Sequence, residues 1–260
     1  WVGGAGAARF VGGRPVPVVS KETITPVLKP FDAEVPFRAR WEALRRGAFF
    51  IAIHDQMADE LHQAGIPRER LRVIPNGVPL PPRAAPVAAN RDVLFLGNFT
   101  QGVHHKAFDI LLRCWKEVAP LQPDSTLHIL GAGDATPWQQ FAAAEGLAGR
   151  VRFHGFVDDP SPFYAKAAVF ILPSRLEGVS NALLEAQSWG LPAVVSDIPG
   201  NRAVVEDGIT GRVCPVNDVP AFAAALLDLL RDPALRERQG RAARARVEER
   251  FGLPRIAAAL

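Results

Sequence analysis

Short apolar runs alternate with longer amphipathic stretches along most of the chain. Apolar runs of strand length, bounded by Gly, Pro or polar residues, predict strands at 15–20, 49–53, 71–74, 93–96, 126–130, 151–153, 169–172, 193–196 and 212–214. The stretches between them predict helices at 37–48, 55–64, 107–118, 138–144, 162–167, 182–189, 201–205 and 234–249, and one that begins after the caps Asn217 and Asp218. This alternation predicts an α/β fold, a doubly wound parallel sheet with helices on both faces.

A proline-rich segment at 79–91 interrupts the alternation and has little amphipathic pattern, which is typical of an interdomain linker. It separates a smaller α/β part, residues 1–78, from a larger one, residues 92–250, which a last segment, 251–260, follows. The first dozen residues are rich in Gly and Ala. They do not match GxGxxG and no strand precedes them, so they are interpreted as a loop.

The stretch from Val169 to Gly200 contains a strand, a turn, a helix and a second strand, with two glutamates, Glu177 and Glu185. A strand that leads into a helix through a polar turn exposes the first amides of the helix at the carboxyl edge of the sheet, where anions bind readily. Because Glu177 would repel a phosphate, we expect it to face neutral hydroxyls while the backbone binds the charge.

Composition and charge describe an ordinary globular protein of 260 residues, 48% hydrophobic and 22% charged. The formal charge of +3 is far below the basic excess of a dedicated nucleic-acid binder. No apolar run approaches the roughly 18 residues of a membrane span, although the helix at 37–48 has a face that could lie on a membrane surface.

The two cysteines, Cys114 and Cys214, form no CxxC pair, and we expect both to be reduced core residues of a cytoplasmic protein. The chain begins at Trp1 and carries no signal-peptide pattern, so it is expected to be a fragment of a longer protein.

Several motifs that would indicate other reaction classes are missing from the sequence. It has no GxxxxGK[ST] phosphate loop, no HExxH, no GxSxG and no Asp-x-Asp. The six histidines are scattered, which argues against a histidine metal site.

Four glycine-rich or polar loops follow predicted strands, at the carboxyl ends where doubly wound sheets bind ligands. They are Gly97-Asn98-Phe99, Gly131-Ala132-Gly133, Gly155-Phe156-Val157 and Glu177-Gly178-Val179-Ser180. Lys106 stands just before a predicted helix, where its charge opposes the helix dipole, so it is either a solvated lysine or a ligand for an anion. Glu185 lies one turn after Asn181, where it could accept hydrogen bonds from a ribose diol or merely stabilise the helix start.

The run EGVSNALLE, from Glu177 to Glu185, resembles the E-x7-E motif of the retaining glycosyltransferases of family 4, which have the GT-B fold. The order of features is similar as well: VIPNGV at Val73–Val78, LGN followed by Lys106, ILGAG, VRFHGFV, FILPS, GLPAVVSDIPG and GITGRV. The resemblance covers roughly Ile51 to Phe251.

The resemblance implies two Rossmann-like domains and a nucleotide-diphosphate sugar donor bound mainly by the carboxyl-terminal one. By position, Glu177 would bind the sugar hydroxyls, the amides of Gly178, Val179, Ser180 and Asn181 the diphosphate, and Glu185 the ribose. Lys106 would stabilise the leaving diphosphate, Gly155, Phe156 and Val157 would border the base, and Gly97 and Asn98 would complete the donor site. It implies transfer with retention of configuration and no required metal, although a divalent cation could bind.

The chain departs from the family pattern at three places. Asn98 stands where the family commonly has Arg, and His104, His105 or Arg175 could compensate. Ala107 replaces a common glycine. Residues 1–78 correspond to only part of the amino-terminal acceptor-side domain, toward which residues 251–260 would return.

These departures leave two function classes open: a glycosyltransferase, or a catalytically incomplete nucleotide-sugar-binding module. A GT-B epimerase or phosphorylase fits less well. We expect no nucleic-acid partner and a cytoplasmic location that allows peripheral association with the inner face of the membrane. The sequence does not identify the base, the sugar, the acceptor or the oligomeric state.

Overall fold

The computed structural model describes residues 10–11, 14–15, 18–21, 48–99 and 105–258, and only the backbone of those before Phe49. Packing divides the chain into two compact units, Trp1–Pro75 and Asn76–Leu260. The predicted helix at 37–48 lies outside the described residues except for Ala48, and so do His104 and most of the predicted first loop.

The smaller unit contains a parallel three-stranded sheet in the order β3-β4-β5, formed by Val18–Lys21, Ala48–Ala52 and Leu71–Val73. An antiparallel pair, β1 (Phe10–Val11) and β2 (Arg14–Pro15), forms a separate sheet. Helix α2 (Asp55–Gln63) and the 3₁₀ helix η2 (Arg68–Arg70) connect β4 to β5. His54 caps α2 by accepting a hydrogen bond from the Met57 amide (3.1 Å), and Gly65, at φ 96°, follows its end as predicted.

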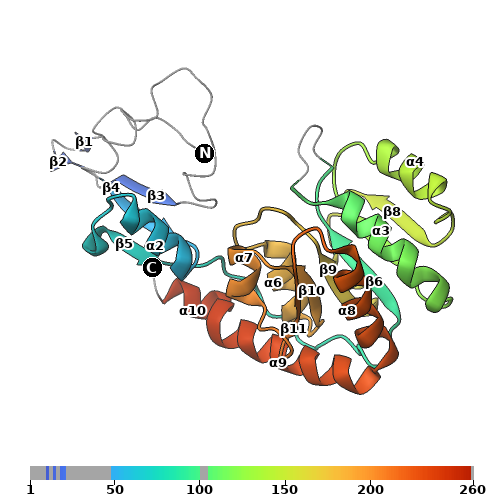
Figure 1. Cartoon of the computed structure of the whole chain (residues 1–260). Coiled ribbons are helices and arrows are strands. Elements are labelled where there is room, and N and C mark those ends of the chain that lie inside the picture. Colours follow the sequence, from blue (N-terminus) through green and yellow to red (C-terminus); the bar gives the residue numbers. More distant parts are fainter. Residues whose placement is uncertain (1–9, 12–13, 16–17, 22–47, 100–104, 259–260) are drawn as a thin grey trace. The chain divides into compact units, whose positions relative to one another are not determined.

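The larger unit is built on a six-stranded sheet in which neighbouring strands are all parallel, in the order β11-β10-β9-β6-β7-β8 (Figure 1). The strands are β6 (Asp92–Leu96), β7 (Leu127–Leu130), β8 (Val151–Gly155), β9 (Ala167–Leu172), β10 (Ala193–Ser196) and β11 (Gly211–Cys214). Strands β6, β7 and β8 are added toward one edge of the sheet, and β9, β10 and β11 toward the other. The order of strand addition therefore reverses between the neighbours β6 and β9. The predicted doubly wound parallel sheet is therefore confirmed, with every predicted strand of this unit present.

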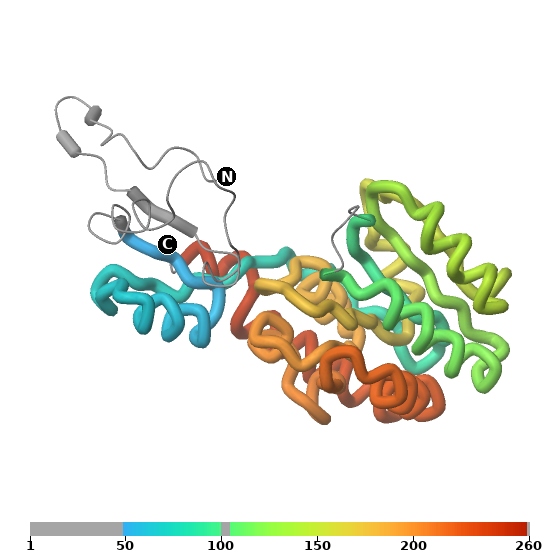
Figure 2. Tube along the Cα trace, turned by 45° about the horizontal axis from the view of Figure 1, so that its top comes forward, coloured from blue at the N-terminus to red at the C-terminus, as the bar shows by residue number. Residues whose placement is uncertain are grey.

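The helices of this unit are α3 (Phe108–Val118), α4 (Thr136–Ala144), α5 (Ser161–Lys166), α6 (Asn181–Ser188), α7 (Pro199–Val204), α8 (Val219–Arg231), α9 (Pro233–Phe251) and α10 (Leu253–Ala257), with η3 (Ala119–Leu121) after α3. Helix α3 packs against α4 and α8, whereas α9 packs against α6 and α8 (Figure 2). Under these helices, strands β9 and β10 are buried over their whole length.

The start of α8 follows the cap chemistry of its sequence. Asp218 accepts a hydrogen bond from the Ala221 amide (3.0 Å), as predicted. Asn217, also predicted as a cap, instead adopts a left-handed conformation at φ 65° and directs its side-chain oxygen to Arg175. Short polar side chains such as Asn tolerate this conformation better than most residues.

The charge pattern of 236–250 predicts a solvated helix face, and α9 has one, but three of its arginines do not lie fully on it. Arg236 is only 2% exposed, and its guanidinium donates five hydrogen bonds to backbone carbonyls. Arg244 and Arg246 likewise donate to backbone carbonyls, those of Ser188 and Pro81 and those of Val204 and Ala203. Periodicity alone cannot distinguish these arginines from solvated ones, because most of their partners lie 42 or more residues away in the sequence.

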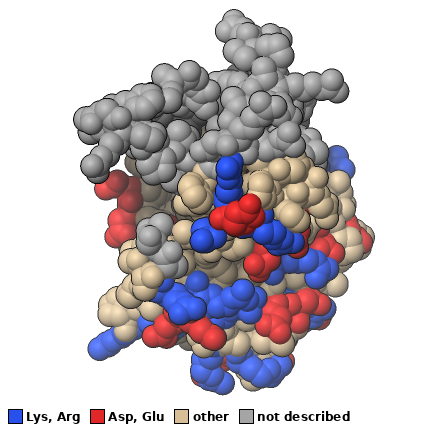
Figure 3. All heavy atoms as spheres, turned by 90° about the vertical axis from the view of Figure 1, so that its left-hand side faces the viewer, with Lys and Arg blue, Asp and Glu red and all other residues tan. Residues whose placement is uncertain are grey.

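Both cysteines are buried and unpaired, as predicted, and burial raises the pKa of Cys214 to about 12. Among the described residues, no helix combines the length and the apolarity that a membrane span requires. On the face of the molecule shown in Figure 3, basic and acidic side chains are interspersed rather than gathered into a patch of one sign.

Candidate functional site

The four loops singled out in the sequence lie at neighbouring strand ends, because β9, β6, β7 and β8 are adjacent and parallel. Backbone hydrogen bonds join them: the Gly97 amide donates to Leu130 (2.8 Å), and the Gly131 amide donates to Gly155 (2.9 Å). A Cβ on Gly131 would lie 2.0 Å from the Gly97 carbonyl oxygen, so only glycine permits this approach. The expected gathering of these loops at one carboxyl edge is therefore confirmed.

Lys106 and Glu177 meet where the winding of the sheet reverses. Lys106 follows β6 and Glu177 follows β9, and their Nζ and Oε1 atoms are 2.5 Å apart. The side chains are only 26% and 14% exposed, so water screens the pair weakly. The hydroxyl of Ser174 also donates to Oε1 of Glu177 (2.9 Å). Within the described residues no hydrogen bond reaches Oε2, which leaves that oxygen for a ligand.

The turn from Glu177 to Ser180 is fixed from three sides. A Cβ on Gly200 would lie 1.8 Å from the Gly178 carbonyl oxygen, so α7 abuts the turn at backbone distance. The side-chain amide of Asn76 donates to the Val179 carbonyl (2.9 Å). Ser180 caps α6 by accepting a hydrogen bond from the Leu183 amide. The first amides of α6, which have no intrahelical acceptor, are thereby held beside Glu177.

Glu185 lies on α6 and accepts a hydrogen bond from the hydroxyl of Tyr164 at 2.9 Å. Burial and the charge of Glu185 raise the pKa of Tyr164, so the phenol stays a neutral donor. This bond occupies Oε2 of Glu185. The other oxygen accepts no hydrogen bond within the part of the chain that the structure describes, so the carboxylate is oriented with one acceptor remaining.

The loop after β8 begins at Gly155, whose φ of 69° is left-handed, and continues to Phe156, whose side chain is 73% exposed. Asn98 lies opposite, at the end of β6. Its side-chain oxygen accepts a hydrogen bond from the Ala132 amide (3.0 Å). Asn98 therefore ties two loops together and contributes no charge to the site.

The guanidinium of Arg175 already binds two side chains of the protein. Its guanidinium donates two hydrogen bonds to the Asp109 carboxylate (2.9 and 2.7 Å) and a third to the side chain of Asn217 (2.7 Å). Burial by itself would raise the pKa of Asp109, but the hydrogen bonds and charge of Arg175 lower it overall. The Arg175 amide donates to the His105 carbonyl (2.7 Å), which joins the turn after β9 to the residue before Lys106.

Three residues around this edge escaped the sequence reasoning: Asn76, Ser174 and Tyr164. Asn76 and Ser174 stand inside the quoted runs VIPNGV and FILPS, so their position after a strand was a usable signal. Tyr164 has no such signal, because it contacts Glu185 across 21 positions of sequence.

Comparison with protein families gives two matches. Residues 90–232 match the family described as glycosyl transferases group 1. Residues 2–80 match the family described as Glycosyltransferase Family 4.

Curated relatives are similar in sequence over much of this chain. A phosphatidyl-myo-inositol mannosyltransferase of Mycolicibacterium smegmatis is 37% identical over 63% of this chain and 44% of its own length. A glycogen synthase of Mycobacterium tuberculosis is 30% identical over 83% of this chain and 53% of its own. The chain thus spans about half the length of these relatives.

Solved structures share the fold. TarM of S. aureus, in complex with fondaparinux, α-GlcNAc-glycerol and UDP, superposes with a TM-score of 0.81 over 95% of this chain and 50% of that protein, at 19% identity. Anabaena HepE, in complex with UDP and glucose, gives 0.79 over 93% and 70%, at 21% identity. Both likenesses extend across the two units of this chain.

Proposed function

Because the chain belongs to the glycosyl transferases group 1, we propose that its larger unit binds a nucleotide-diphosphate sugar for a retaining glycosyltransferase. The contact between Lys106 and Glu177 beside the α6 amino terminus carries this proposal. A cation, a carboxylate and the free amides of a helix amino terminus lie together between β6 and β9, where the strand order of the sheet reverses. Doubly wound sheets usually bind their ligands at this position. The UDP complex of HepE, a protein of the same fold, supports the choice of ligand.

The donor would bind along the carboxyl edge. Lys106 and the amides of the Gly178–Asn181 turn would bind the diphosphate, because the amino terminus of a helix favours anions. Glu185, oriented by Tyr164, would accept hydrogen bonds from the ribose diol. The base would lie against the Gly155–Val157 loop, where Phe156 offers an exposed ring, and Gly97 and Asn98 would line the opposite side.

The reaction would depend on electrostatic stabilisation of the leaving group. The bond from the anomeric carbon to the diphosphate breaks, and a bond to the acceptor oxygen forms on the same face of the sugar. The acceptor proton passes to the departing phosphate, and Lys106 stabilises the charge that develops there. Glu177 orients the sugar through its hydroxyls. We propose that this step requires no metal.

The second candidate is a nucleotide-sugar-binding module without transferase activity. Two observations favour it: Asn98 supplies no charge to the site, and Arg175 is held by Asp109 and Asn217. Screening the full-length protein for donor hydrolysis against a panel of nucleotide sugars separates the two candidates. Turnover of any donor favours the enzyme, and tight binding without turnover favours the module.

Nucleoside diphosphates should stabilise the protein, because a ligand at 100 times its Kd adds about 2.7 kcal/mol to the free energy of unfolding. In a thermal-shift assay with UDP, GDP and ADP, we expect at least one to raise the Tm. Glu185→Ala should weaken that nucleotide about 10-fold to 100-fold, since a hydrogen bond to a charged group contributes about 1.5–3 kcal/mol.

Glu237→Ala is the matched control for this experiment, because Glu237 is exposed on α9 and, among the described residues, pairs with Arg241 alone. It should leave the nucleotide shift unchanged. A folded sample that responds to none of the three nucleotides would refute the donor site.

A further inference from the structure

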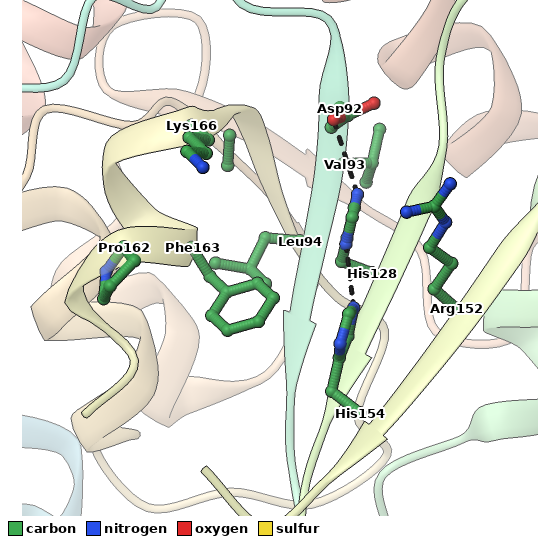
Figure 4. Close-up of a pocket in the computed structure, with 10 residues that line it drawn as sticks. Asp92, Val93, Leu94, His128, Arg152, His154, Pro162, Phe163 and Lys166 are labelled. Atoms are coloured by element: carbon green, nitrogen blue, oxygen red, sulfur yellow. Dashed lines mark hydrogen bonds and ion pairs between the residues drawn. The ribbon is translucent and has the colours of Figure 1, made fainter. Parts of the chain in front are cut away.

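A pocket lies on a face of the six-stranded sheet rather than at its carboxyl edge. Its volume is about 250 Å³. The side chains of Asp92, His128, Arg152 and His154 point to it from β6, β7 and β8, and Phe163 and Lys166 close it from α5 (Figure 4). None of the predicted donor-site residues lines it.

The strand register accounts for this polar face. Leu94, His128 and Arg152 are in register across β6, β7 and β8, and residues two positions apart on a strand share a face. The alternate residues of the same strands, such as Val93 and Ile129, are fully buried. Parallel sheets are normally apolar on both faces, under helices. Over this polar face lies α5, a helix of only six residues.

A chain of hydrogen bonds crosses the pocket. His128 lies 3.4 Å from Asp92 through Nε2 and 2.9 Å from His154 Nε2 through Nδ1. Only one proton fits between the two rings, so the histidine pair accepts at most one positive charge without breaking this bond. The ring of Phe163 stands edge-on to His154 at a centroid distance of 4.6 Å. Within the described residues these groups do not form a cluster of metal ligands.

The charges of the pocket are unbalanced. Burial by itself would raise the pKa of Asp92, but hydrogen bonds from His128 and the Thr126 amide, with the charges of His128 and Arg152, lower it overall. Asp92 is therefore ionised and already hydrogen-bonded. Arg152 and Lys166 form no ion pair in the part of the chain that the structure describes. Figure 4 shows them on opposite sides of the histidine row, which leaves two cations facing one carboxylate.

We propose that this pocket binds a small phosphate monoester, such as a sugar phosphate. The phosphate accepts hydrogen bonds from Arg152 and Lys166, and the protonated histidine pair supplies the third positive charge. Phe163 and Pro162 contact the carbon skeleton of the ligand. The site is separate from the donor site, so it does not depend on the proposed function.

The pKa of the His154 ring indicates whether an anion occupies this pocket. Burial, the charge of His128 and the charge of Arg152 lower the pKa of His154, so the ring is neutral at neutral pH in the absence of an anion. A bound phosphate stabilises the protonated ring and should raise this pKa. The titratable and charged groups that line the pocket with His154 are His128 on β7, Arg152 on β8, Lys166 on α5 and Asp92 on β6, beyond His128.

The experiment is an NMR titration of the histidine ring protons against pH, with UDP saturating the donor site. It compares buffer with inorganic phosphate, glucose 6-phosphate and glucose. We expect both phosphates to raise the pKa of His154 and glucose to leave it unchanged. A stronger effect of glucose 6-phosphate assigns the site to sugar phosphates, and equal effects assign it to free phosphate.

Arg152→Gln and Lys166→Gln should each weaken phosphate binding about 10-fold to 100-fold, as expected for one charge-assisted hydrogen bond. Both side chains are exposed, so the variants should fold, which circular dichroism checks. Arg241→Gln, another exposed arginine, should bind phosphate as the wild type does. An unchanged His154 pKa with both phosphates, or equal affinity in Arg152→Gln and wild type, would overturn the proposal.

Discussion

Tyr164 donates the one hydrogen bond that the side chain of Glu185 accepts within the described residues. Its ring is buried and its hydroxyl donates 2.9 Å to Oε2 of the carboxylate. Removing Glu185 leaves the buried hydroxyl with its longer contact to the Ala182 carbonyl (3.4 Å), and removing the hydroxyl takes away the hydrogen bond to Oε2 of Glu185. The two side chains therefore act as one unit.

Tyr164→Phe should reduce the free energy of unfolding by about 1.5–3 kcal/mol, the usual contribution of a hydrogen bond to a charged group. It should also weaken nucleotide binding, because Glu185 is no longer oriented. A double-mutant cycle with Glu185→Ala checks this, with affinities measured by calorimetry. We expect Tyr164→Phe to have no further effect once Glu185 is absent. Additive effects would show that Tyr164 acts independently of Glu185.

At the scale of elements, close approaches between glycines fix how the helices pack. Gly240, in the middle of α9, lies against the turn that follows α6. A Cβ at this position would lie 2.1 Å from the Gly190 carbonyl oxygen. The contact surface of α9 with α6 therefore depends on a residue that by itself weakens a helix.

Gly240→Ala tests two opposing effects. Helix propensity alone would stabilise α9 by about 1 kcal/mol, whereas the clash with a backbone oxygen should cost about 1–3 kcal/mol or more. We expect net destabilisation in urea unfolding. Arg238→Ala, at an exposed position of the same helix, should change stability by less than about 0.5 kcal/mol. A stabilised Gly240→Ala variant would mean that α9 can move away from α6.

Local chemistry predicted most of the elements. The strand at 193–196 matches β10 residue for residue, and Asp218 caps α8, because apolar runs and caps depend on neighbouring residues. The same reasoning found both glutamates and Lys106. It could not pair Lys106 with Glu177, 71 positions away, nor find Tyr164 or the buried role of Arg236. Such contacts arise only when the sheet is assembled.

At the scale of the whole larger unit, Arg236 links the proline-rich segment at its beginning to the end of helix α8. Its donors reach Val87, Ala88 and Asn90 in the proline-rich segment, and Leu229 and Leu230 at the end of α8. Burial lowers its pKa, and no carboxylate is among its hydrogen-bond partners. All five N–H donors are used, which a planar guanidinium achieves and an ammonium cannot.

Arg236→Lys should therefore reduce the free energy of unfolding by about 2–4 kcal/mol, since several buried carbonyls lose their donors. Urea unfolding measures the change. Arg241→Lys is the matched control, because Arg241 is exposed and its one ion pair within the described part of the chain is with Glu237. Equal stability of the two variants would contradict the role given to Arg236.

The short helix α5 presents adjacent residues to two different sites. Tyr164 points inward to Glu185, whereas Phe163 and Lys166 line the phosphate pocket. A ligand that shifted this turn would therefore change the free energy of binding at the other proposed site. Thermodynamic reciprocity then fixes the size of the effect: the factor by which a phosphate changes nucleotide affinity equals the factor by which the nucleotide changes phosphate affinity. If both proposed sites bind their ligands, one turn of helix would thus couple the two binding equilibria within the larger unit.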